Sequence, residues 1–164
     1  MGAPQFVPPP IAQPFRAPPS KLTQVPTLGT LLIVHGALVM VWALFCVLAI
    51  AIGAINVGFL GAGKDEDYIV IALYTVFAAG ALPVAILEIV AGVRMRSLRS
   101  RNLAFVALFA SVASFFCGNV FCLPLSLGLA VWGLLVLLDR SVIDGFARVQ
   151  AGEGARPVLA DASR

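Results

Sequence analysis

The chain has 164 residues, of which 60% are hydrophobic and only 12% are charged. A soluble domain is usually about 45–50% apolar and about 25% charged, so a soluble fold would have too few charges to cover this much apolar surface. The net charge of +3 is small, and the basic residues lie in the tails and one turn without interleaved aromatic residues. This pattern argues against nucleic-acid binding and for a membrane protein.

The first 27 residues hold eight of the eleven prolines in the chain. Proline at this density blocks both helix and sheet, so residues 1–27 are expected to form a disordered tail. The segment has no apolar core region, which argues against a cleaved signal peptide. Two interpretations stay open: a tail that docks on a partner, and a flexible leader.

Residues 22–63 contain no Lys, Arg, Asp or Glu, and this stretch exceeds the roughly 20 residues that one membrane span needs. A first helix is predicted over about residues 28–55. The glycines that follow are expected to loosen the chain into an outer loop that ends in a solvated charge cluster. The glycines are Gly53, Gly58, Gly61 and Gly63, and the cluster is Lys64, Asp65, Glu66 and Asp67.

Three further apolar segments predict three more spans, over about residues 68–93, 102–120 and 121–138. Pro83 lies inside the second helix and should kink it, whereas Pro124 lies in the first turn of the fourth, where a missing N–H costs little. Period-2 alternation is absent, so a β-barrel is not expected. The predicted fold class is an all-α bundle of four transmembrane helices, over residues 28–138.

The distribution of Lys and Arg predicts the orientation of the bundle. Ten basic residues fall in the two tails and the middle turn, and only Lys64 falls on the other side. Because cytoplasmic segments carry the excess of Lys and Arg, both termini are expected in the cytoplasm and the protein in the plasma (inner) membrane. The middle turn contributes four topology-setting arginines: Arg94, Arg96, Arg99 and Arg101.

The chain after the fourth span begins with an amphipathic pattern. Val142, Phe146 and Val149 fall at i, i+4 and i+7, on one face of a helix. Residues 139–150 are therefore predicted to form a short helix on the inner leaflet. Residues 151–164 are expected to be disordered.

His35 and Glu88 are the two ionisable residues well inside the predicted spans. Such groups are costly in a bilayer and are by default functional. Both are expected roughly 8–10 Å below the cytoplasmic interface on antiparallel helices, so they are predicted to form an intramembrane polar pair. The pair is either a proton or cation relay or a structural clasp, and a third interpretation has Glu88 extending towards the arginine turn.

Small residues and cysteines mark the third predicted helix. Ala110, Ser114 and Gly118 form a ladder that favours close helix packing, within the bundle or between two copies, and Ala107 and Ser111 form a second ladder. Cys117 and Cys122 are either two reduced thiols or a local disulfide. They have no His or acidic neighbour, so no metal site is expected.

Residues 123–146 resemble the terminal segment of small bacterial membrane proteins that contain a domain of unknown function. In that family a proline-led apolar helix with a Trp precedes a closing Phe. The residues matching in spacing are Trp132, Leu134, Leu137, Val142 and Phe146, while Ala130, Val131 and Arg140 depart from the usual Gly, Ile and Pro. The resemblance implies a four-helix bundle behind a proline-rich leader and implies no activity.

The sequence therefore favours a non-enzymatic scaffold or interaction protein. Its expected partners are the lipid bilayer and either a second copy or another membrane protein, and no cofactor is expected. The alternative is a small transporter or channel subunit that uses the pair of His35 and Glu88. An enzyme is disfavoured because no second catalytic carboxylate, nucleophile–base pair or metal set is recognised.

Overall fold

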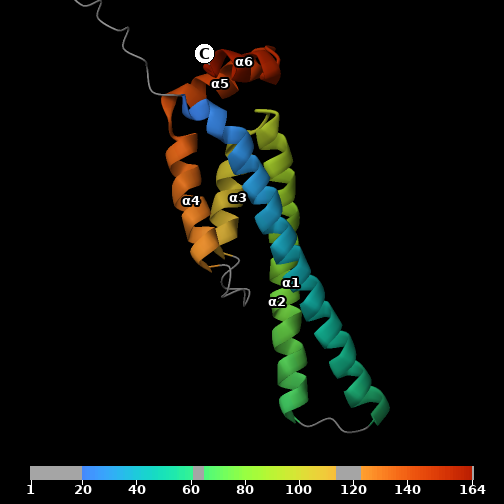
Figure 1. Cartoon of the computed structure of the whole chain (residues 1–164). Coiled ribbons are helices and arrows are strands. Elements are labelled where there is room, and N and C mark those ends of the chain that lie inside the picture. Colours follow the sequence, from blue (N-terminus) through green and yellow to red (C-terminus); the bar gives the residue numbers. More distant parts are fainter. Residues whose placement is uncertain (1–19, 61–64, 114–122, 164) are drawn as a thin grey trace, which may run out of the picture.

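A computed structural model of the chain describes residues 20–60, 65–113 and 123–163. Within these ranges the protein is built from helices alone, as the predicted all-α class requires (Figure 1). In chain order they are η1 (Lys21–Gln24), α1 (Val25–Leu60), α2 (Asp65–Arg96), α3 (Arg101–Ala113), α4 (Leu123–Leu137), α5 (Arg140–Gln150) and α6 (Ala155–Ala162).

In the described ranges, two segments are long and apolar enough to cross a membrane: Lys21–Gly58, which is η1 with most of α1, and Asp65–Arg96, which is α2. Helix α3 is a shorter apolar helix. Helices α4 and α5 would count as a third candidate only if taken as one span, and they are bent by 71° where they meet. Because of this bend, α5 runs across the end of the bundle rather than along it (Figure 1).

Helices α1 and α2 form a long antiparallel hairpin, and α3 and α4 pack beside only part of its length (Figure 1). The first helix begins earlier and ends later than expected, at Val25 and Leu60. It therefore takes in Gly58 as well as Gly53. A glycine costs a helix about 1 kcal/mol relative to alanine. That cost is tolerated in an apolar segment, where the helix satisfies backbone groups that water does not reach. Gly53 also faces the Ile71 side chain of α2.

The acidic residues expected in the outer loop belong to a helix instead. Asp65, Glu66 and Asp67 form the first turn of α2. Carboxylates at this position interact favourably with the partial positive charge of a helix N-terminus, which explains why α2 starts earlier than the apolar pattern indicated. Gly61, Gly63 and Lys64 lie outside the described residues. At its other end α2 extends to Arg96, and it contains Pro83.

Small residues allow α1 and α2 to approach very closely. A Cβ atom built on Gly92 would lie 2.5 Å from the carbonyl oxygen of Gly29, and one built on Gly29 would lie 2.8 Å from the carbonyl oxygen of Gly92. Further along, Ala43 and Ala85 are fully buried. Gly29 and Ala43 are two heptads apart on α1, and Gly92 and Ala85 one heptad apart on α2. These positions form the small-residue seam of the hairpin.

The structure closes one end of the bundle with a cap formed by η1, α5 and α6. The buried apolar residues of the cap continue the core of the bundle. They are Leu22, Val142, Phe146 and Val158, and Leu98 of the α2–α3 turn belongs to the same core. Two expectations of disorder are thereby corrected. Residues 20–27 form η1 and the start of α1, and residues 155–162 form α6, because Leu22 and Val158 have apolar side chains to bury.

Polar contacts fix the two ends of α5. Asp139 caps its first turn by accepting a hydrogen bond from the Ser141 backbone N–H at 3.0 Å, and it pairs with Lys21 of η1 at 3.3 Å. The hydrogen bonds from Ser141, and then the nearby Lys21, lower the pKa of Asp139. At the other end, Arg148 binds Glu153 and Asp161 at 2.8 and 3.1 Å, which ties α6 to α5.

Candidate functional site

The two ionisable residues predicted inside the spans lie against each other. His35 on α1 and Glu88 on α2 are joined by a hydrogen bond of 2.7 Å between Nδ1 and Oε2. Both side chains are sealed from solvent, with exposed fractions of 1% and 0%. A buried polar group without a partner is costly, so this contact explains how both residues are tolerated in an apolar core.

A third residue extends the pair into a chain. Ser126, on α4, places its Oγ 2.8 Å from Nε2 of His35 and is itself 1% exposed. Both ring nitrogens of His35 are therefore hydrogen-bonded, one to each of two other helices. The Ser126–His35–Glu88 chain connects α4, α1 and α2 through side chains alone.

The local packing that brings the carboxylate to the imidazole depends on Gly36, directly after His35. A Cβ atom on Gly36 would lie 3.0 Å from both the carbonyl oxygen of Ala85 and Cβ of Glu88. A larger residue would push the helix backbones apart. Gly36 thus permits the close helix approach at which His35 and Glu88 are hydrogen-bonded at 2.7 Å.

Hydrogen-bond rules leave few proton arrangements for this chain. If Glu88 is a carboxylate it only accepts, so Nδ1–H of His35 donates to it. Nε2 then either accepts from the Ser126 hydroxyl, leaving a net charge of −1, or donates to it as part of an imidazolium, leaving the chain neutral. If the imidazolium instead passes its Nδ1 proton to Oε2 of Glu88, the chain is also neutral. Low-dielectric surroundings favour the neutral arrangements.

One oxygen of the chain is unsatisfied. Oε1 of Glu88 is buried and has no hydrogen-bond partner among the described residues. A charged oxygen without a donor costs more than a neutral one. This unpaired atom is a second reason to expect that the buried chain carries no net charge.

The connectivity matches that of a serine hydrolase triad, in which serine, histidine and a carboxylate are hydrogen-bonded in that order. Acyl transfer also needs a cleft at the nucleophile and donors for an oxyanion. Ser126 is 1% exposed. The nearby groove of about 210 Å³ on the α1–α4 face is lined by Leu31, Trp132 and residues of α4 other than Ser126. The hydrogen-bond order of a triad is thus present at a serine that is buried in this structure.

The other residues singled out in the sequence are spread over the molecule. Ala110 is half-buried on α3, while Ser114, Gly118, Cys117 and Cys122 lie outside the described residues. Ala107 and Ser111 are both buried. Of the four turn arginines, Arg94, Arg96 and Arg99 are exposed, and Arg101 is half-buried with its guanidinium 5.2 Å from the centre of the Phe105 ring.

Ser126 was missed by reasoning from the sequence, although its depth was a usable signal. It lies 11 residues before Leu137, the last residue of α4, and His35 lies 10 residues after Val25, the first of α1. At 1.5 Å per residue both are about 15–17 Å from the same end of the bundle.

Comparison with protein-family models, with curated proteins and with solved structures found no match for this chain. Its function is therefore argued from its own residues.

Proposed function

We propose that the protein is an integral membrane protein that acts as a non-enzymatic scaffold, with the Ser126–His35–Glu88 chain as a clasp between its helices. In this proposal four helices cross the plasma (inner) membrane and both termini face the cytoplasm. The observation that carries the proposal is the buried hydrogen-bonded chain, in which polar side chains from three helices bond to one another. The outer surfaces of the helices remain available for lipid and for partner proteins.

The arrangement of charge supports the topology. The cap and the α2–α3 turn lie at one end of the molecule, and the acidic first turn of α2 lies at the other (Figure 1). The described basic residues all belong to the first of these ends. They are Lys21, Arg94, Arg96, Arg99, Arg101, Arg140, Arg148 and Arg156. A cytoplasmic location for that end satisfies the positive-inside rule.

The second candidate is a proton relay, and the observation in its favour is the orphaned Oε1 of Glu88. A relay needs polar groups through the whole depth of the membrane. In the half of the hairpin beyond the clasp, the hydroxyl of Thr75 is bonded to the carbonyl oxygen of Ile71, and Asn56 is exposed on the surface. These residues do not continue the chain, so the clasp is the better supported of the two.

Proton flux into proteoliposomes distinguishes the two candidates. The vesicles carry a pH-sensitive dye, and an imposed potential drives protons inward. A clasp predicts that the parent protein and Glu88→Gln leak no faster than protein-free vesicles. A leak in the parent protein that Glu88→Gln abolishes would establish the relay and contradict the clasp.

A further inference from the structure

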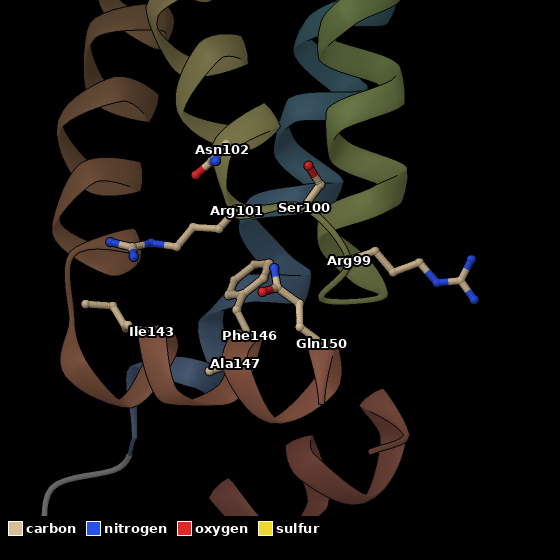
Figure 2. A pocket seen from close by; sticks show the side chains of 8 residues that line it. All are labelled: Arg99, Ser100, Arg101, Asn102, Ile143, Phe146, Ala147 and Gln150. Atoms are coloured by element: carbon tan, nitrogen blue, oxygen red, sulfur yellow. The ribbon is translucent and has the colours of Figure 1, made fainter. Parts of the chain in front are cut away.

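A cavity at the capped end of the molecule has the charge and position of a phosphate site. It has a volume of about 300 Å³ and lies between the α2–α3 turn and α5 (Figure 2). Arg99, Arg101 and Asn102 line it from the turn and the start of α3, and Phe146 and Gln150 line it from α5. No carboxylate is among its lining residues, so the cavity is positively charged.

The two arginines of the cavity have no acidic partner in the described part of the chain. Among the described residues, the ion pairs of this end join Lys21 to Asp139 and Arg148 to Glu153 and Asp161, and none includes Arg99 or Arg101. Arg101 also has a buried Nε atom without a hydrogen-bond partner. A buried guanidinium nitrogen that lacks an acceptor is costly, and an anionic oxygen in the cavity would supply one.

The backbone adds to this preference. Helix α3 begins at Arg101, on the rim of the cavity. The N–H groups of a first helical turn have no intrahelical acceptor and carry partial positive charge, which suits a phosphate. Figure 2 shows Arg99 and Arg101 extending in opposite directions from the turn, with Phe146 and Gln150 of α5 between them. The site thus combines cationic side-chain donors with backbone N–H donors.

We propose that this cavity binds the phosphate group of an anionic phospholipid. The inference rests on the membrane insertion in the proposed function, which puts the α2–α3 turn and α5 at the level of the head groups. The choice of a lipid over a soluble phosphate follows from this position and from the lining, in which the partly exposed Ile143 offers apolar surface beside the arginines. A lipid presents both a phosphate and apolar carbon, and basic pockets at the ends of membrane helices suit such head groups.

The test uses the full chain in a neutral detergent, with phosphatidylglycerol, phosphatidylcholine or inorganic phosphate added separately. Native mass spectrometry counts bound lipid, and the thermal unfolding midpoint reports binding independently. Phosphatidylglycerol is expected to bind saturably and to raise the midpoint. At the same concentrations, phosphatidylcholine is expected to bind at least about tenfold more weakly, and inorganic phosphate is expected to leave the midpoint unchanged.

Matched variants locate the site. Arg99→Gln with Arg101→Gln should weaken phosphatidylglycerol binding by at least about tenfold. Arg94→Gln with Arg96→Gln removes the same charge from exposed positions outside the cavity and should leave binding within about twofold. Equal losses in the two double variants would show diffuse surface attraction and overturn the site, and so would stabilisation by inorganic phosphate alone.

A single substitution covers the case in which the double variant does not fold. If the double variant fails to fold, Arg99→Gln alone keeps the test decisive, because this exposed side chain makes no ion pair with a described residue. Loss of lipid binding would leave the flux result and the clasp untouched, so failure of this inference is distinguishable from failure of the proposed function.

Discussion

At the scale of single residues, the backbone of Leu98 departs from ordinary conformations. Leu98 follows α2 with a φ of 52°, in the left-handed region where glycine is preferred. Its N–H donates to the Met95 carbonyl at 2.9 Å, and the Arg99 N–H donates to the Arg94 carbonyl at 3.1 Å. These are the two bonds of a Schellman motif. The side chain is fully buried in the core, and this burial explains why leucine occupies the position.

A pair of substitutions separates the backbone of Leu98 from its side chain. Leu98→Ala should cost about 2–5 kcal/mol of stability by emptying the buried site. Leu98→Gly removes nearly the same volume but relieves the left-handed strain of about 1–2 kcal/mol. Unfolding in mixed micelles should therefore find the glycine variant at least as stable as the alanine variant. A clearly more stable alanine variant would show that the strain is absent.

The pairing of His35 and Glu88 was predictable because both are rare residue types in apolar segments at similar depth. Ser126 was harder to single out, because serine is common in membrane helices and its hydroxyl is often bonded within its own helix. Of the cap, the helix α5 was predictable from its amphipathic pattern, but η1 and α6 were not. Val158 belongs to a short stretch of mixed apolar and polar residues, and its burial depends on a surface that exists only once η1 and α5 have docked.

At the scale of helices, the segments of the hairpin were predictable from apolar runs, but their ends were not. Glycine and acidic residues suggested breaks that the structure does not have near residues 53–58 and 65–67. The seam that joins α1 and α2 also escaped prediction, although its signal was present. Gly29 and Gly36 are one heptad apart, as are Ala85 and Gly92, whereas the ladder predicted to favour close packing lies on α3.

Two glycines of the hairpin provide a matched test of the seam. A Cβ on Gly92 would lie 2.5 Å from a backbone oxygen of α1, whereas a Cβ on Gly58 would have no neighbour within 4 Å. Gly92→Ala should therefore lower the unfolding free energy by about 1–3 kcal/mol through overpacking. Gly58→Ala should leave it unchanged or raise it by up to about 1 kcal/mol. Equal effects on thermal unfolding in detergent would mean that the seam does not set the helix spacing.

At the scale of the whole molecule, the proposed topology makes a direct prediction about accessibility. Three single-cysteine variants, Arg99→Cys, Arg156→Cys and Asp65→Cys, are made after the native cysteines are replaced by alanine. All three positions are exposed. In intact cells an impermeant thiol reagent should label position 65, and positions 99 and 156 should react only after lysis. Labelling of position 99 from outside would reverse the orientation.

The central claim is that Ser126, His35 and Glu88 stabilise the bundle as one hydrogen-bonded unit. The most direct test is a double-mutant cycle of His35→Ala and Glu88→Ala, read by unfolding in mixed micelles. The clasp predicts that each substitution destabilises the protein and that the double variant costs less than their sum, with a coupling of about 0.6 and at most about 2 kcal/mol. Thr75→Val combined with Glu88→Ala is the control, since Thr75 bonds its own helix, and this pair should be additive. Strict additivity of His35→Ala and Glu88→Ala as well would contradict the clasp.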